Sequence, residues 1–341
     1  MIKLIDPPKK LVDEKGDVIL GLFNKPVEFI NGKEFVYFDE SDKKVTGRKK
    51  LRKIHKFNFY GIINETWIIG FAVVDLNYLG NAFLYLYNRK DKKIYEYNYK
   101  SPFSKAISFS DYTGKGDISY INGRIRFVIK QDIVNKRRLV DISIPGLKLN
   151  FEMEDDYDKY QPLSISARNS YSGWTYTQKK VGSPVKEGIL QFKNQSYDLK
   201  GSKLVFDWTN GYLRRDTYWL WAAATGHIGD MELGFNFSNG VNETSFTENG
   251  IWVDGKMVPV NGINIIYNRF NPNDKWKVFT NDGKVNLIFT PEGARHERIN
   301  ALVIKSNFYQ FFGHYEGTIE YDGKKLEVSA VGFSEKHYAK W

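Results

Sequence analysis

Three acidic residues in the second half of the sequence stand close to tryptophans, in a pattern that could support acid chemistry. Asp207 is followed by Trp208, and Trp252 lies between Glu248 and Asp254. An aromatic pocket disfavours the carboxylate anion, so the pKa of a carboxyl held there rises. A carboxyl that keeps its proton near neutral pH can protonate an alkene or a leaving oxygen. Asp207, Glu248 and Asp254 are therefore our candidate catalytic residues.

Each of these acids also has a structural interpretation. Asp254 begins an Asp-Gly pair, in which aspartate commonly serves the turn itself. Glu248 precedes an Asn-Gly pair, although glutamate is not a typical turn residue. Asp207 could form an ion pair with Arg214 or Arg215. The sequence leaves both interpretations open for all three acids.

Two tryptophans stand two residues apart in a probable strand, so their side chains share one face. Trp219 and Trp221 would form a flat apolar wall, which fits either a core or the wall of a ligand cavity. Arg215 has the same parity, and a buried guanidinium there would need a carboxylate or an anionic head group. The candidate ligand-binding residues are the tryptophans of this region with nearby polar groups: Trp208, Arg215, Trp219, Trp221, His227, Asn249 and Trp252.

Several classes of site are excluded by residue type. The chain has no cysteine, so it has no disulfide, thiol nucleophile or thiolate metal site. Its five histidines show no metal-ligand spacing, and Gly114-x-Gly116 lacks the lysine of a phosphate loop. We therefore expect no metal and no cofactor.

Turn signals dominate the elements that must position these residues. The sequence contains six Asn-Gly and three Asp-Gly pairs, which favour two-residue type I′ hairpins. Alternating apolar residues flank several of them, for example around Asn122-Gly123 and Asp322-Gly323. The pattern predicts an all-β fold of sandwich or barrel type. Residues 291–300 are the best candidate for a short helix.

The length of 341 residues favours two domains. The acidic, proline-ended segment near residues 153–165 is the expected linker. We therefore expect an N-terminal β domain over residues 1–160 and a C-terminal β-barrel over residues 161–341. Aromatic residues make up 16% of the chain, which raises the question of whether some rings line a cavity.

The net charge of +10 raises the question of a nucleic-acid partner, but most of this charge fits a solvated surface. The sharpest basic cluster runs from Arg48 to Lys56, whereas the other basic residues are interleaved with acids. No nucleic-acid module accompanies it, so a nucleic-acid partner is not expected. Peripheral contact with an anionic membrane stays an alternative. The N-terminal residues have no secretion signal, and no apolar run is long enough to span a bilayer, so we expect a cytoplasmic protein.

The segment 206–255 resembles the DUF2804 family, whose reaction is not known. The matching positions are Asp207-Trp208, Gly211, Trp219-x-Trp221-Ala222, Gly226, Gly234-x-Asn236, Glu248-Asn249 and Trp252-x-Asp254-Gly255. Further matches lie at Gly173-Trp174-x-Tyr176-Thr177-x-Lys179, Gln310-Phe311-Phe312-Gly313, Gly332-Phe333 and Glu335. More remotely, the arrangement is similar to the lipocalin-like group of carotenoid 1,2-hydratases and tocopherol cyclase. That resemblance implies two tandem antiparallel barrels and an apolar, isoprenoid-type ligand.

These observations favour a protein that binds an apolar or amphiphilic small molecule in an aromatic-lined β-barrel cavity. Acid catalysis of the hydratase, cyclase or isomerase type is one form of this hypothesis, and binding without chemistry is another. The alternative is a carbohydrate-active or carbohydrate-binding protein that uses an aromatic platform and paired carboxylates.

Overall fold

A computed structural model describes residues 3–242, 246–301 and 304–340. Nearly all regular structure in these residues is antiparallel strand, which confirms the predicted all-β class with two barrel-like units. The only α-helix among them is the short α1 (Gly47–Leu51), preceded by a 3₁₀ turn at Gly32–Glu34 and the small hairpin β2 (Tyr37–Phe38) and β3 (Lys44–Val45). No helix in the described part of the chain is long and apolar enough to cross a membrane.

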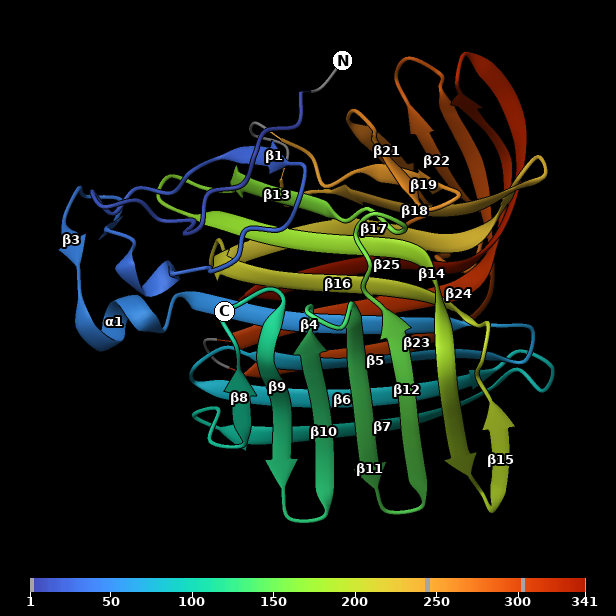
Figure 1. The fold of residues 1–341 in the computed structure, drawn as a ribbon, viewed down its shortest axis with the longest axis horizontal. Coiled ribbons are helices and arrows are strands. Elements are labelled where there is room, and N and C mark those ends of the chain that lie inside the picture. The colour runs from blue at the N-terminus through green and yellow to red at the C-terminus, as the bar shows by residue number, and fades with distance from the viewer. Residues whose placement is uncertain (1–2, 243–245, 302–303, 341) are drawn as a thin grey trace.

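The first sheet has fourteen strands and curls into a nearly closed barrel (Figure 1). Its main path runs in the order β7 (Lys93–Pro102), β6 (Leu79–Asn88), β5 (Trp67–Asp75), β4 (Ile54–Ile63), β16 (Lys203–Tyr212), β14 (Trp174–Phe192), β12 (Leu147–Glu154), β11 (Arg137–Ile144), β10 (Ile125–Asp132), β9 (Lys115–Asn122) and β8 (Ile107–Phe109). Three short strands join it at the side: β1 (Gly21–Phe23), β13 (Leu163–Arg168) and β15 (Gln195–Asp198).

The second sheet has nine strands and forms a curved half-barrel, which extends from the centre to the upper right of Figure 1. Its order is β20 (Lys256–Pro259), β19 (Gly250–Val253), β18 (Met231–Asn239), β17 (Asp216–Ile228), β25 (Lys324–Lys340), β24 (Ile304–Tyr321), β23 (Val285–Ala301), β22 (Trp276–Thr280) and β21 (Ile263–Ile266).

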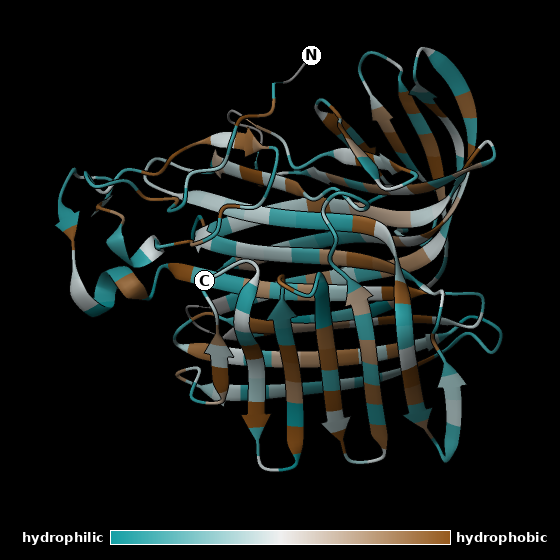
Figure 2. Cartoon of the chain, in the orientation of Figure 1, coloured by the Kyte–Doolittle hydropathy of each residue, from teal (hydrophilic) through white to brown (hydrophobic). Residues whose placement is uncertain are grey.

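Alternation of side chains divides the apolar residues among three cores. Figure 2 shows the alternation of hydrophobic and hydrophilic residues along β9 to β12. Inward residues such as Tyr60, Phe71 and Ile129 fill the first barrel, so its interior is packed core. A second core lines the half-barrel. The third lies between the sheets, where Phe59 of β4 meets Trp221 of β17 edge to face, with ring centroids 5.8 Å apart.

The helix predicted for residues 291–300 was wrong, because these residues continue strand β23. Pro291 lies at an irregularity of the β23–β24 pairing, between Pro291 and Gly293. A proline is tolerated at such a bulge because no ladder hydrogen bond is needed from it there. The ring of His296 stacks on Tyr309 of the neighbouring strand, with centroids 3.8 Å apart.

The change from one sheet to the other occurs between Tyr212 and Asp216, and not at the boundary expected at residue 160. Strands β13, β14 and β16 follow the predicted linker but belong to the first sheet. The acidic segment does not behave as a solvated linker, since Asp155 inside it is 1% exposed.

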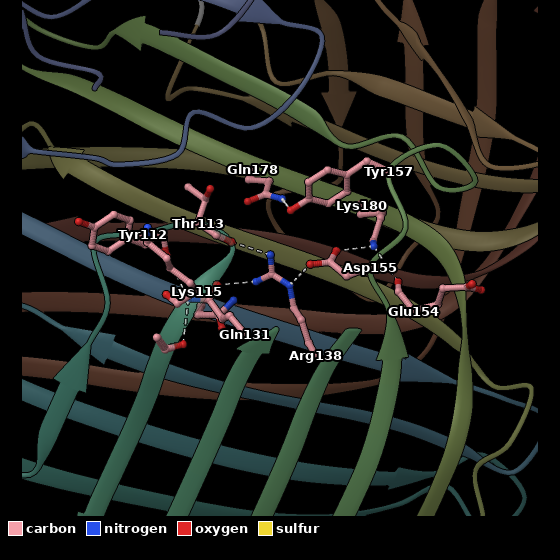
Figure 3. Close-up of polar contacts among 12 residues, drawn as sticks. Tyr112, Thr113, Lys115, Gln131, Arg138, Glu154, Asp155, Tyr157, Gln178 and Lys180 are labelled. Carbon is pink, nitrogen blue, oxygen red and sulfur yellow. Dashed lines mark hydrogen bonds and ion pairs between the residues drawn. The ribbon is translucent and has the colours of Figure 1, made fainter. Parts of the chain in front are cut away.

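Asp155 forms the centre of a buried ionic cluster in the first barrel (Figure 3). Its carboxylate accepts hydrogen bonds from Arg138 Nε and Lys180 Nζ, each across 2.7 Å. Arg138 also donates to Gln131 Oε1 and to the carbonyl of Thr113, each across 2.8 Å. Burial alone would raise the pKa of Asp155, but the two cations outweigh it and lower the pKa to about 2. The segment is therefore anchored in the first unit by charge.

Candidate ligand cavity and buried acid

A cavity of about 220 Å³ lies between the two sheets. One wall is the outer face of the first barrel, and the other is the face of the half-barrel that packs against it. Most of the lining surface is apolar, although seventeen of the thirty described lining residues are polar or charged. The wall from the first unit includes Phe57, Phe59, Ala72, Val74, Leu76, Leu79, Phe83, Lys179 and Asp207, and the wall from the second includes Trp219, Trp221, Glu248, Arg295, Phe308, Gln310, Glu335 and His337.

The alternation of β17 places its two tryptophans in this cavity. Trp219 and Trp221 face the first barrel, whereas Leu220 and Ala222 enter the core of the half-barrel. The Trp221 indole N–H donates to Asn236 Oδ1 across 2.7 Å, so this ring is held in place. The shared face predicted from spacing is therefore present in the structure.

Glu335 of β25 is a buried acid of the cavity lining that accepts hydrogen bonds from two other lining residues. Its side chain is buried, and it lies opposite Trp221 in the β17–β25 register. Trp219 Nε1 donates to its Oε1 across 2.7 Å, and Gln310 Nε2 donates to its Oε2 across 2.9 Å. Burial raises the pKa of Glu335 to about 7, although both hydrogen bonds and the charge of Arg295 pull the pKa the other way. The acid therefore exists in both protonation states near neutral pH.

Gln310 is itself oriented by the first barrel. The hydroxyl of Tyr85 on β6 donates to Gln310 Oε1, which leaves the amide NH₂ to face Glu335. Tyr85 reaches this position across Gly70, where an added Cβ would lie 2.1 Å from the tyrosine hydroxyl. The geometry of the acid thus depends on both sheets.

Lys179 of β14 lies between two of the predicted acids. Its Nζ is 2.6 Å from Asp207 Oδ2 and 3.1 Å from Glu248 Oε2, and all three groups are buried. Burial alone would lower the pKa of Lys179, but the two carboxylates outweigh it and the pKa is raised. Lys179 is therefore a cation, and Asp207 and Glu248 line the cavity as its counter-ions.

Asp254, the third predicted acid, lies away from the cavity lining. It occupies the β19–β20 turn with a φ of 47°, and its Oδ1 accepts a hydrogen bond from the Glu232 backbone N–H across 3.0 Å. The structure therefore places it in the turn role that Asp-Gly pairs commonly have.

The other predicted ligand-binding residues are dispersed. Trp208 is part of the first barrel core, and Trp252 donates to the carbonyl of Gln161 across 2.6 Å. Asn249 accepts a hydrogen bond from the Ser238 backbone N–H across 2.7 Å. His227 is exposed near the end of β17. Arg215 lines a second pocket, described below.

The polar lining residues that sequence reasoning did not select include the buried Lys179, Arg295, Gln310 and Glu335. Lys179, Gln310 and Glu335 stand in the segments that carry the family resemblance, which was the available signal. Arg295 gave no such signal. Its guanidinium is almost fully buried, pairs with Glu96 across 3.0 Å, and lies over the rings of Phe83 and Phe308.

Comparison with known proteins adds family and fold. The DUF2804 profile, described as a domain of unknown function, matches residues 3–341. No curated protein matches the chain in sequence. The fold is similar to that of kievitone hydratase from Nectria haematococca, with a TM-score of 0.51 and 10% identity, covering 83% of this chain and 88% of that one. It is also similar to CghA with Sch210972, with a TM-score of 0.52 and 8% identity, covering 98% of this chain and 97% of that one.

Proposed function

Since the chain belongs to the DUF2804 family, which has no known function, we propose its function from the cavity itself. The protein binds an apolar or amphiphilic small molecule between its two sheets and transfers a proton to it from Glu335. The observation that carries this proposal is the buried Glu335 carboxyl in the cavity lining, with a pKa raised to about 7. A general acid works best when its pKa is near the working pH.

The proposed step is protonation of a carbon–carbon double bond. The Glu335 O–H gives its proton to one carbon, and the π-electron pair becomes the new C–H bond. The neighbouring carbon becomes a cation, which the electron-rich rings of Trp219 and Trp221 stabilise. A water molecule then bonds through its oxygen to that carbon and returns a proton to the Glu335 carboxylate, so that the net reaction is hydration.

The same acid could serve related reactions, because the group that captures the cation decides the product. A hydroxyl of the ligand in place of water gives cyclisation, and loss of a proton from an adjacent carbon gives isomerisation. Kievitone hydratase, whose name describes a hydration, supports this class through fold similarity alone.

The carbohydrate alternative receives less support. Glycoside hydrolysis needs a pair of carboxyls that act as acid and as base or nucleophile. Asp207 and Glu248 both contact the Lys179 ammonium, and giving up either charge would leave that buried cation poorly compensated. Their contacts with Lys179 therefore fit a role in holding the cavity wall.

The test uses deuterium as a tracer for proton transfer. The protein in D₂O is incubated with farnesol and with a prenylated phenol, and products are followed by liquid chromatography and mass spectrometry. We expect deuterium on carbon, with or without addition of D₂O. The Glu335→Gln variant should lose this activity, whereas Glu327→Gln, an exposed position on the same strand, should keep it.

Native mass spectrometry of the purified protein provides the binding readout. A co-purified apolar molecule in both wild type and Glu335→Gln would support the cavity as the binding site. Equal deuterium incorporation by wild type and Glu335→Gln would refute the role given to Glu335. Binding of oligosaccharides alone, with no apolar ligand, would refute the proposal as a whole.

A further inference from the structure

A second, more open pocket of about 610 Å³ gathers basic side chains from two distant parts of the chain. Arg52 and Lys53 come from the part of the basic cluster Arg48–Lys56 that follows α1, and Arg214 and Arg215 come from the link between the two sheets. Glu40 is the one acidic residue in the described lining. The surface between these segments is therefore strongly cationic.

The basic pocket adjoins the apolar cavity. Leu213 lines both of them, on the segment that connects β16 to β17. The β5–β6 turn also contributes to both, since Tyr78 lines the basic pocket while Leu76 and Leu79 line the cavity. One molecule could therefore reach both compartments by passing Leu213.

The pocket contains polar groups with unused hydrogen-bonding capacity. Within the described residues, Arg52, Lys53, Arg214 and Arg215 form no salt bridge. Arg214 donates through Nη2 to the Gly240 carbonyl, but its buried Nε has no hydrogen-bond partner among those residues, and the same holds for the hydroxyl of Tyr78. Buried donors without a partner are rare and call for a ligand or a water.

We propose that the basic pocket binds a carboxylate or phosphate head group of an amphiphile whose apolar body passes Leu213 into the cavity beside Glu335. This inference rests on the proposed function, since the cavity must accept the apolar body. Guanidinium groups bind carboxylates and phosphates through paired hydrogen bonds, and the donors of Arg214 and Arg215 that have no partner among the described residues suit that role.

A single-chain ligand explains the arrangement better than a bilayer does. The four cations line a concave pocket that shares its Leu213 wall with an apolar cavity, whereas a bilayer surface would require cations spread over a face. Arg48 and Lys49 of α1, by contrast, are exposed and do not line the pocket. They therefore provide a matched pair of charges for a control.

The experiment measures binding of three twelve-carbon probes by isothermal titration calorimetry: dodecanoate, dodecyl phosphate and 1-dodecanol. Inorganic phosphate tests the head group without a tail, and vesicles containing phosphatidylserine test a bilayer. The pocket variant is K53Q/R215Q, and the control variant is R48Q/K49Q, which removes the same charge. Each measurement is made at low and at high salt.

We expect an anionic probe to bind wild type at least about tenfold more tightly than 1-dodecanol, which corresponds to about 1.4 kcal/mol. K53Q/R215Q should lose about this factor for the anions and keep the affinity for 1-dodecanol, and R48Q/K49Q should change neither. High salt should weaken only the anions. The tighter of the two anionic probes identifies the head group.

Three outcomes would overturn the inference. If all three probes bind equally and K53Q/R215Q does not change their affinity, the proposed head-group site is refuted. The proposed apolar cavity would stand. Binding of no twelve-carbon probe would remove both proposals. Binding of inorganic phosphate as tightly as dodecyl phosphate would show that the alkyl tail contributes nothing. That result, or binding to anionic vesicles, would assign the basic residues to a surface role.

Discussion

The indole nitrogen of Trp219 lies 2.7 Å from Oε1 of Glu335 on the neighbouring strand and donates a hydrogen bond to it. A hydrogen bond to the carboxylate favours the ionised form and so opposes the effect of burial. The pKa of about 7 is therefore a balance, in which the buried surroundings raise the value and a few donors restrain it.

Replacement of Trp219 by phenylalanine should shift this balance. The Trp219→Phe variant keeps most of the ring area and removes the donor, so the pKa of Glu335 should rise above 7 by about one to two units, since a hydrogen bond to a charged group contributes about 1.5–3 kcal/mol. The measurement is carbon-13 NMR of labelled glutamate, with Glu335→Gln to assign the signal. Trp221→Phe is the control, because its donor contacts Asn236. An unchanged pKa in Trp219→Phe would contradict this account.

Protonation of Glu335 should also make stability depend on pH. The folded protein holds this proton up to about pH 7, whereas the ordinary value in an unfolded chain is 4.5. The contribution of this group is therefore fully present below pH 4.5 and is lost as the pH rises through 7, by about 3 kcal/mol. Urea unfolding at pH 5 and pH 8 measures the difference, and Glu335→Gln should reduce it. An identical pH dependence in the variant would contradict the prediction.

The buried cluster around Asp155 should respond to pH in the opposite sense. Its pKa is lowered to about 2 from 3.8, so its contribution to stability is present above pH 3.8 and is lost as the pH falls through 2. At neutral pH, Asp155→Asn leaves Arg138 and Lys180 poorly compensated and should cost about 3–5 kcal/mol. Thermal and urea unfolding provide the measurement, with the exposed Asp158→Asn as control. A loss below about 1 kcal/mol would mean that water or neighbouring groups compensate the two cations.

Gly70 provides a test of the link between the sheets. A methyl group there would lie 2.1 Å from the Tyr85 hydroxyl, so Gly70→Ala should displace Tyr85 from Gln310 at a cost of about 1–3 kcal/mol. The proton-transfer activity should fall as well, because Gln310 would lose its orientation. Gly262→Ala is the control, since nothing lies within 4 Å of the added carbon. Full activity and stability in Gly70→Ala would show that Tyr85 can relax freely.

The Asn-Gly and Asp-Gly pairs predicted the all-β fold, but not every pair forms the turn that was expected of it. Both residues of Asp254-Gly255 and of Asp322-Gly323 have positive φ, as type I′ turns require. At Asn122-Gly123 only the glycine has positive φ, and Gly123 and Arg124 connect the strands. Asn210-Gly211 lies within β16 and makes no turn, because pairing on both sides outweighs local preference. Lys193 and Asn194 form a positive-φ turn that the sequence did not signal.

The sequence predicted the relative positions of site residues only where those residues lie on the same strand. Parity placed Trp219 and Trp221 on one face, since alternation is local. Glu335 is 116 residues from its partner Trp219, so their contact depends on which strands pair, and no local pattern specifies this. The three candidate acids were selected because tryptophans stand close to them in sequence, and this criterion does not show which face of a strand each side chain occupies. Asp207 and Trp208 are adjacent in sequence, so they lie on opposite faces of β16. Trp208 is in the first barrel core, whereas Asp207 lines the cavity.

Tyr85 of the first sheet orients Gln310 of the second, and Gln310 donates a hydrogen bond to Glu335. The surroundings of the Glu335 carboxyl therefore depend on both sheets. Burial raises the pKa of Glu335 to about 7, and that burial exists only while the sheets stay closed against each other. A ligand that wedges them apart would admit water, ionise Glu335 and so switch off its own proton donor. The fraction of Glu335 that carries its proton thus depends on how closely the two sheets pack, and a ligand too wide for the closed cavity would receive a proton less readily.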